Sequence, residues 1–344
     1  MAADNNKVKV LVVDDSLFFR TAIANALSSH PNLRVVGMAA SAFEAKDKIQ
    51  ELNPDVVTLD VEMPKMNGIE FLKILMAQKP MPVVVVSAVN GIVFEAFKAG
   101  AVDFVVKPAS AKPDNMSGFF SDLAGKILIA ASAKLKYGKS EMQVPVHASG
   151  RIKNMNGLIA LGASTGGTEA TSAILKALPP GIPGMVVTQH MPPVFTKMYA
   201  QRLDKECALS VKEAEDNDIV MPGHVYVAPG DKQMTVTKKG GSMIIHCKPG
   251  EKVSGHCPSV DVLFGSVAEF ANENTIGIIL TGMGSDGAKG MLAMRQKGAY
   301  TIGQDEKSSV VYGMPMVAYK VGAVAKQTSL ENIAGTLLEY LVRK

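Results

Sequence analysis

The sequence predicts an α/β protein with two sheets, each covered by helices on both faces. Two observations carry this prediction. Nearly continuous apolar runs alternate with helix-like segments along most of the chain, as expected for parallel strands joined by helical crossovers. The chain also has 344 residues, which is too long for one ordinary domain and suits two.

A polar stretch, residues 136–155, separates the two sets of apolar runs. It has neither helical nor strand periodicity, and we interpret it as a linker. The predicted organisation is therefore one domain over residues 1–135 and a second over residues 156–344. The alternative is an irregular loop inside one larger domain.

The composition narrows the possible classes of function. Hydrophobic residues make up 47% of the chain and charged residues 20%, so two buried cores are feasible. The net charge is +4 with no basic block, which argues against a nucleic-acid partner. No apolar run is long enough to cross a membrane, so we expect a cytoplasmic protein without membrane insertion. Three cysteines without metal-ligand spacing are expected to be free thiols.

The first domain is expected to contain five strands, because five apolar runs end in polar or turn-forming residues. The strands are expected at Val8–Val13, Leu33–Met38, Val56–Leu59, Val83–Val86 and Val102–Val106. Helices are expected at Leu17–Leu27, Ala42–Leu52, Ile69–Met76, Gly91–Ala99 and Phe119–Leu135. Pro64 and Asn67-Gly68 interrupt regular structure after the third strand and predict a loop there.

Polar side chains follow four of these five strands. They are Asp14, Asp15, Asp60, Ser87 and Lys107. The carboxyl ends of parallel strands meet at one edge of the sheet, where ligands bind. Converging carboxylates repel one another and require a cation, and hard oxygen ligands suit Mg²⁺. A lysine and a hydroxyl at the same edge suggest a transferred phosphoryl group.

Residues 6–130 resemble the receiver domain of two-component signalling. The resemblance rests on Asp14-Asp15 after the first strand, Asp60 after the third, Ser87 after the fourth and Lys107-Pro108 after the fifth. It implies a flavodoxin-like fold in which Asp60 accepts phosphate from a histidine kinase.

The same resemblance implies a set of magnesium ligands. Asp15, Asp60 and the Glu62 carbonyl would hold Mg²⁺, and Asp14 would reach it through water. Mg²⁺ is therefore the cofactor expected for receiver phosphorylation.

The resemblance also assigns roles around the phosphoryl group. Ser87 and Lys107 would contact its oxygens, and Phe104 falls where receivers keep a switching aromatic residue. The Lys107–Pro108 bond would be cis.

The second domain is expected to repeat the α/β layer design. Strands are expected at Leu158–Leu161, Met185–Thr188, Leu209–Lys212, Val225–Ala228, Ile276–Leu280 and Tyr300–Ile302. Helices are expected at Thr168–Leu178, Val194–Cys207, Val260–Glu273, Gly287–Lys297 and Leu330–Val342. Met234–Thr237 and Met243–His246, on either side of Gly240-Gly241, predict an inserted hairpin.

The stretch Gly162-Ala163-Ser164-Thr165-Gly166-Gly167 lies between a predicted strand and a predicted helix. A Gly-x-Ser-x-Gly sequence in this context is typical of a nucleophile elbow, in which the serine sits on a sharp, strained turn. The alternatives are a glycine-rich loop without chemistry and a loop that cradles a phosphate.

Two further strand ends carry possible partners for Ser164. His190 follows the strand Met185–Thr188, and Asp286 follows the strand Ile276–Leu280. A serine needs a base within hydrogen-bond reach, and the base needs a third group to orient it. The sequence therefore predicts a Ser-His-Asp triad, in a chain order that differs from those of the α/β-hydrolases and the serine proteases.

A rival interpretation uses the same loop. Gly282-x-Gly284-x-x-Gly287 follows a strand and opens a helix, and Asp305 lies 18 residues beyond Gly287. This spacing is close to a dinucleotide-binding fingerprint. It leaves Ser164 and His190 without a role, and it would place the Asp286 carboxylate beside a pyrophosphate.

The chain from about residue 156 onward resembles the catalytic domain of the chemotaxis protein-glutamate methylesterases. The motifs that carry the resemblance are residues 162–167, 188–192, 258–264, 280–287, 304–306 and 311–315. A receiver in front of such a domain is the architecture of that family. The resemblance implies a Rossmann-like domain with a mostly parallel sheet, and hydrolysis of glutamate γ-methyl esters on chemoreceptors by Ser164, His190 and Asp286.

The resemblance points to the Met283 backbone N–H as an oxyanion donor, and the geometry of an elbow also allows Thr165. An amide is an acyl donor of the same shape as the ester, so deamidation of receptor glutamines is expected as well. No cofactor is expected for the esterase. Two departures from the family pattern are small: Met198 replaces a small polar residue, and Asn67 replaces an aspartate.

The resemblance further implies regulation, in which the unphosphorylated receiver covers the Ser164 edge and phosphorylation of Asp60 opens it. An alternative from another class is a phosphorylation-switched binding module whose second domain is inactive.

Overall fold

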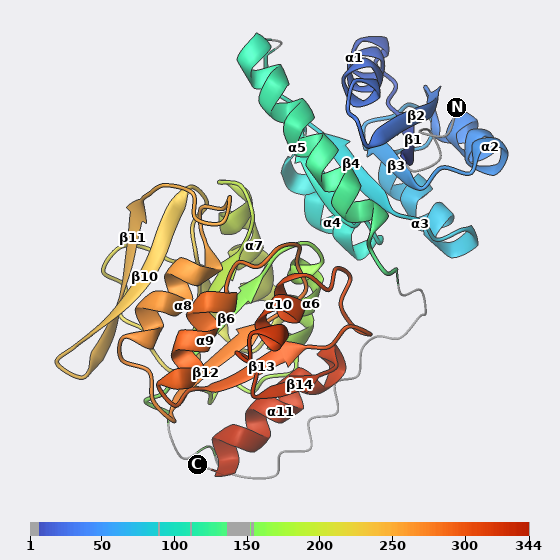
Figure 1. Cartoon of the computed structure of the whole chain (residues 1–344). Helices are drawn as coiled ribbons and strands as arrows, with labels where there is room; N and C mark the ends of the chain where they lie inside the picture. The colour runs from blue at the N-terminus through green and yellow to red at the C-terminus, as the bar shows by residue number, and fades with distance from the viewer. Residues whose placement is uncertain (1–6, 89, 111, 136–151, 153–154, 344) are drawn as a thin grey trace. The chain divides into compact units, whose positions relative to one another are not determined.

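The structure is a computed structural model that describes residues 7–88, 90–110, 112–135, 152 and 155–343. The described residues form two compact units, divided between residues 139 and 140. Each unit consists of a sheet with helices on both faces (Figure 1). The predicted linker, residues 136–155, lies almost entirely outside the described residues, so its boundaries remain a prediction.

The first unit contains a five-stranded parallel sheet in the order β2-β1-β3-β4-β5. The strands are β1 (Val8–Val13), β2 (Leu33–Ala39), β3 (Val56–Asp60), β4 (Val83–Ser87) and β5 (Asp103–Val106). Helices α1 (Leu17–Ser28) and α5 (Pro113–Ala131) contact each other on one face. The other face carries α2 (Ala42–Leu52), α3 (Gly68–Gln78) and α4 (Val93–Lys98), preceded by the 3₁₀ turn η1 (Asn90–Ile92).

The central strands of this sheet are buried along their whole length. Every residue of β3 (VVTLD) and β4 (VVVVS) is buried, as expected for strands covered on both faces. Asn67 caps α3 by accepting a hydrogen bond from the Glu70 backbone N–H at 2.9 Å. An aspartate or an asparagine serves equally well in this position, which explains why the departure at Asn67 is tolerated.

Two expectations for the first unit were wrong. The last helix runs over Pro113–Ala131 rather than the expected Phe119–Leu135. It begins earlier because proline is well suited to the first turn of a helix. The Lys107–Pro108 bond is trans, the lower-energy isomer; among the described residues the cis bond is Cys257–Pro258.

The second unit contains a seven-stranded sheet in the order β14-β13-β12-β6-β7-β9-β8, and every pairing in it is parallel. The strands are β6 (Leu158–Ala163), β7 (Gly184–Gln189), β8 (Ser210–Glu213), β9 (His224–Val227), β12 (Thr275–Ile279), β13 (Tyr300–Gln304) and β14 (Lys326–Thr328). Strand β6 is central, and the chain winds first to one side of it and then to the other. The predicted α/β class with parallel sheets is confirmed.

Six helices of this unit cover the two faces of the sheet (Figure 1). On one face, α9 (Ala288–Gln296) contacts both α8 (Val260–Ala268) and α10 (Met314–Lys320). On the other face, α6 (Gly167–Lys176) contacts both α7 (Phe195–Glu206) and α11 (Leu330–Arg343). The short elements α10 and β14 were not expected from the sequence.

The predicted hairpin is present and forms a separate two-stranded sheet. Its antiparallel strands are β10 (Lys232–Lys239) and β11 (Ser242–Pro249). It lies beside α8 (Figure 1), and the Val236 N–H donates to Ser266 Oγ of that helix at 3.0 Å. Met234 and Ile245 of the hairpin are fully buried in the same core cluster as Phe264 of α8.

Candidate functional sites

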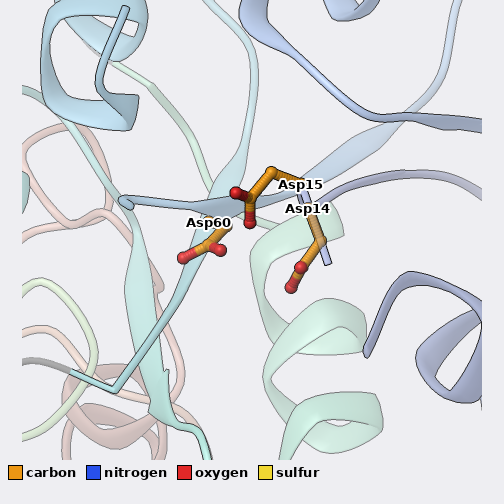
Figure 2. Close-up of side chains that lie close together, drawn as sticks. All are labelled: Asp14, Asp15 and Asp60. Carbon is orange, nitrogen blue, oxygen red and sulfur yellow. The ribbon is translucent and has the colours of Figure 1, made fainter. Parts of the chain in front are cut away.

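The first site lies where β1 and β3 end side by side. The chain passes from β1 to β2 on one side and then returns to β3 on the other side of β1. Open α/β sheets place their ligands where the strand order reverses in this way. Asp14 and Asp15 follow β1, and Asp60 is the last residue of β3. One carboxylate oxygen of each lies within 4.8 Å of the others. Figure 2 shows the three side chains close together. Asp14 and Asp60 are buried, whereas Asp15 is exposed.

Lys107 joins the two buried carboxylates. Its Nζ lies 2.8 Å from Asp14 Oδ2 and 2.6 Å from Asp60 Oδ2, and its side chain is 8% exposed. Burial alone would lower the pKa of Lys107, but hydrogen bonds to Asp14 and Asp60 raise it above its ordinary value. The lysine therefore remains a cation beside Asp60.

Burial also acts on Asp60. It raises the pKa of this carboxyl above its ordinary value and outweighs the hydrogen bond from Lys107. Three clustered carboxylates fit a divalent cation, because hard oxygen ligands suit Mg²⁺ and its charge favours their ionised forms. The prediction of an acidic site able to hold Mg²⁺ is thus supported by the residues themselves.

The remaining residues predicted for this site occupy neighbouring strand ends. Ser87 is the buried last residue of β4, and Lys107 immediately follows β5. Glu62 lies in the loop after β3, with its N–H donating to Asp60 Oδ1 at 3.2 Å. Phe104 is buried in β5, with its ring against Phe97.

The second site is centred on Ser164, directly after the central strand β6. The Ser164 N–H donates to the Thr281 carbonyl at 3.0 Å, which ties the turn to the loop after β12. Its own carbonyl accepts from the Gly167 N–H at 2.7 Å and from Gln189 Nε2 at 2.8 Å. Strain at the serine was expected, but Ser164 has no left-handed backbone; Gly166 takes that conformation instead, with φ of 77°. Glycine adopts this conformation without a steric penalty, so the sharp turn is placed two residues beyond the serine.

His190 lies at the end of β7, the strand next to β6. Its N–H donates to the Ala163 carbonyl at 3.1 Å, so its backbone is fixed beside the residue before Ser164. Its ring Nε2 lies 2.8 Å from Asp286 Oδ2. In the part of the chain that the structure describes, the buried Nδ1 has no hydrogen-bond partner. Nδ1 is therefore the ring atom left available for proton transfer.

Asp286 is held by the N-terminus of α8. Besides His190, its carboxylate accepts hydrogen bonds from Ser259 Oγ at 2.8 Å, the Val260 N–H at 2.8 Å and the Asp261 N–H at 2.9 Å. Burial opposes its charge, but the hydrogen bonds from His190, Asp261 and Val260 hold the pKa of Asp286 below its ordinary value. A helix N-terminus also favours a negative charge. Asp286 is therefore a fixed anion beside His190.

The two residues expected to bind an oxyanion flank the serine. Thr165 follows it directly and is buried, and its carbonyl accepts from Thr281 Oγ1 at 3.0 Å. Met283 is 48% exposed and follows Gly282, where an added Cβ would lie 2.6 Å from Ser164 Cβ. The structure thus brings the Met283 loop against Ser164. Met198 is half-buried in the first turn of α7, and nothing in the structure explains this departure from the family pattern.

Sequence reasoning missed three side chains that support the site. Ser259 bonds to Asp286, and Gln189 bonds to the Ser164 carbonyl. The His256 ring stacks on His190, with ring centroids 3.6 Å apart. The sequence contained a signal for Ser259, because a serine directly before an apolar run indicates a helix N-cap. His256 had none, because its contact joins two loops that are distant in sequence.

The structure argues against the dinucleotide-binding interpretation, because Asp305, the acidic residue it requires, is already hydrogen-bonded within its own turn. Asp305 Oδ1 accepts hydrogen bonds from the Ser308 N–H at 2.8 Å and from Ser308 Oγ at 2.6 Å, so this carboxylate closes its own turn. Asp286 faces His190 and the N-terminus of α8. The geometry therefore favours the triad.

Together the two sites define a class of protein: a receiver joined to an α/β domain that carries the residues of a serine hydrolase. Residues 10–115 match the family model for the response regulator receiver domain, and residues 159–337 match that for CheB methylesterase. The chain belongs to the CheB methylesterase family, in the form that carries a receiver domain. The predicted family is thereby confirmed.

Relatives of nearly the same length support this assignment. The protein-glutamate methylesterase/protein-glutamine glutaminase 2 of Syntrophomonas wolfei is 52% identical over 97% of this chain and 98% of its own. The protein of Salmonella typhi named protein-glutamate methylesterase/protein-glutamine glutaminase is 45% identical over 97% of each chain. The crystal structure of the Thermotoga maritima CheB methylesterase catalytic domain has 38% identity and a TM-score of 0.52, covering 53% of this chain and 97% of that one.

Among the helices that the structure describes, none is both long enough and apolar enough to cross a membrane.

Proposed function

We infer that this protein hydrolyses glutamate γ-methyl esters on chemoreceptors and deamidates receptor glutamines. The observation that carries the inference is the pairing of His190 with Asp286 through Nε2. Among the described residues, this leaves the buried Nδ1 beside the Ser164 strand without a hydrogen-bond partner. The names and family of the full-length relatives support the same activity.

The first half of the reaction forms an acyl-enzyme. His190 Nδ1 takes the proton of the Ser164 hydroxyl as Oγ attacks the ester carbonyl, and Asp286 stabilises the resulting imidazolium. Backbone N–H groups of Met283 and Thr165 bind the oxyanion. The C–O bond to the methoxy group then breaks, and methanol leaves with the proton from His190.

The second half returns the enzyme to its starting state. His190 takes a proton from water, and the hydroxide attacks the acyl carbon. The bond to Ser164 Oγ breaks, and the serine recovers its proton from His190. A glutamate carboxylate remains on the receptor. With a glutamine substrate, ammonia replaces methanol as the leaving group.

The receiver domain would regulate the esterase activity through its phosphorylation. A histidine kinase would phosphorylate Asp60, with Mg²⁺ held by Asp15, Asp60 and the Glu62 carbonyl, and Asp14 acting through water. Lys107 already spans Asp14 and Asp60 and would bind the phosphoryl oxygens together with Ser87. In the unphosphorylated state the receiver would cover the Ser164 edge. Phosphorylation would then shift the equilibrium toward an open, active state.

The test is methanol release from methylated receptor membranes. Ser164→Ala should remove this activity while the protein remains folded, because alanine has no nucleophilic oxygen. Ser210→Ala serves as a control, since this serine is exposed in the edge strand β8. Methanol release by Ser164→Ala at the wild-type rate would rule out the nucleophile.

A further inference from the structure

The His190 ring has a second aromatic ring lying flat against it. The centroids of His190 and His256 are 3.6 Å apart, and the ring planes differ by 11°. The side chain of His190 is only 6% exposed, and His256 is half-buried. This contact is separate from the hydrogen bond between His190 and Asp286.

One hydrogen bond does not fix the plane of an imidazole. The Nε2 bond to Asp286 holds one ring atom, but the ring can still tilt about that point. A parallel ring at van der Waals distance restricts this tilt. His256 therefore controls the direction in which Nδ1 points, the atom that must meet the Ser164 hydroxyl.

The backbone of His256 is built to hold this position. Val253 and His256 exchange both N–H to carbonyl hydrogen bonds, at 3.0 and 2.9 Å. The intervening Ser254 and Gly255 both have positive φ, at 54° and 85°, which is typical of a tight type I′ turn. His256 thus emerges from a short closed turn.

Gln233 of the hairpin anchors the same segment. Its Nε2 donates to the Glu251 carbonyl at 2.8 Å and to the His256 carbonyl at 3.4 Å. Its Oε1 accepts from the Ser259 N–H at 2.9 Å. The side-chain amide of Gln233 therefore fixes one segment with two roles. This segment carries His256, which stacks on His190, and Ser259, which bonds to Asp286.

We propose that His256 is a positioning residue for the reaction: its neutral ring stacks on His190, orients Nδ1 toward Ser164 and stabilises the imidazolium formed when the serine proton is transferred. The proposal rests on the proposed esterase function. It goes beyond the triad because it assigns a role to a side chain that acts through His190.

The electrostatic surroundings agree with a neutral ring. Burial, and after it the charge of His190, lowers the pKa of His256 to about 4; Asp286 acts in the opposite direction, and Lys252 adds to the lowering. A neutral ring attracts a cation placed over its face, whereas a second cation would repel it.

The test compares His256→Ala with His256→Phe in the full-length protein. We expect His256→Ala to lower kcat for methanol release by about 10- to 100-fold with little change in KM, because a misdirected base slows proton transfer. His256→Phe retains a flat uncharged ring and should recover most of kcat. His246→Ala is the matched control, since this histidine of the same unit contacts Thr237 and Asp216. A wild-type kcat for His256→Ala, or equal losses in both variants, would overturn the proposal.

A second readout does not depend on the substrate. In NMR spectra of histidine-labelled protein, we expect the His190 ring signals to lose a ring-current shift in His256→Ala. Unchanged His190 signals would refute the stack. If the wild type releases no methanol but these shifts occur, the esterase function fails and the stack stands.

Discussion

At the scale of the residue, His256 makes the stability of the folded protein depend on pH. Burial and His190 lower its pKa to about 4 in the folded protein, whereas an unfolded histidine titrates near ~6.5. Between these two values the unfolded chain binds a proton that the folded protein does not. The free energy of unfolding therefore rises with pH across this window, and the stabilisation is complete above ~6.5.

This linkage predicts a smaller acid sensitivity for His256→Phe. Wild type should lose more stability than the variant when the pH falls from 7 to 4.5, because only wild type has to keep His256 unprotonated in the folded state. Urea unfolding followed by circular dichroism at both pH values measures the difference. His246→Phe is the control, and an equal pH dependence in wild type and His256→Phe would contradict the argument.

The proposed catalytic residues could be inferred from the sequence, whereas the residues that hold them in place could not. Ser164, His190 and Asp286 each follow an apolar run, and parallel strands bring such positions to one edge. Ser259 and His256 lie in a loop whose path depends on Gln233 of the hairpin, and no periodicity encodes that contact. For the same reason, the sequence did not reveal that Gly166, rather than Ser164, would carry the left-handed turn.

At the scale of the element, α8 and β6 approach each other closely. A Cβ at Gly162 of β6 would overlap Val260 Cγ1 and lie 2.9 Å from Cγ2. The backbone N–H of Val260 bonds to Asp286. The close approach of strand and helix therefore helps to position Asp286.

We predict that Gly162→Ala destabilises the protein by about 1–3 kcal/mol through overpacking, and lowers activity by displacing the N-terminus of α8. Adding Val260→Ala should recover part of both losses, since it makes room while keeping the backbone N–H. Thermal unfolding and methanol release are measured for wild type, both single variants and the double variant, which together form a double-mutant cycle. Gly265→Ala in α8 is the control, because no atom of the described part of the chain lies within 4 Å of its added Cβ. Additive effects in the double variant would show that Gly162 and Val260 do not interact.

Strands with continuous apolar runs followed the sequence closely, whereas several helix ends and the short helix α10 did not. Strands β1, β3 and β4 matched within one residue because their apolar runs are continuous. Helix α8 ends at Ala268, five residues before the expected end, and α10 has only seven residues. One or two turns of helix carry too little periodicity to be recognised, and tertiary packing determines where they end.

At the scale of the whole molecule, the two units are expected to act through phosphorylation. A small phosphodonor with Mg²⁺ should stimulate methanol release by the wild type. Asp60→Asn should remain at the unstimulated rate, because an amide cannot accept the phosphoryl group. Acid-labile phosphate and methanol are measured on the same samples. Full labelling or full stimulation of Asp60→Asn would contradict the assignment of Asp60.

Removal of residues 1–150 gives a separate test of how the receiver acts. If the unphosphorylated receiver covers the Ser164 edge, the shortened protein should have a higher unstimulated rate than the full chain. An unchanged rate would argue against occlusion and leave the Asp60 chemistry intact.

The hairpin β10–β11 lies outside the seven-stranded sheet, and through Gln233 it holds the loop that supports His190 and Asp286. Two-stranded elements open more readily than the centre of a sheet. The amides of this hairpin should therefore exchange with solvent sooner than those of β6. Each such opening would release His256 and Ser259 together, so the working lifetime of the site is set by the local stability of the hairpin and not by the unfolding of the whole domain.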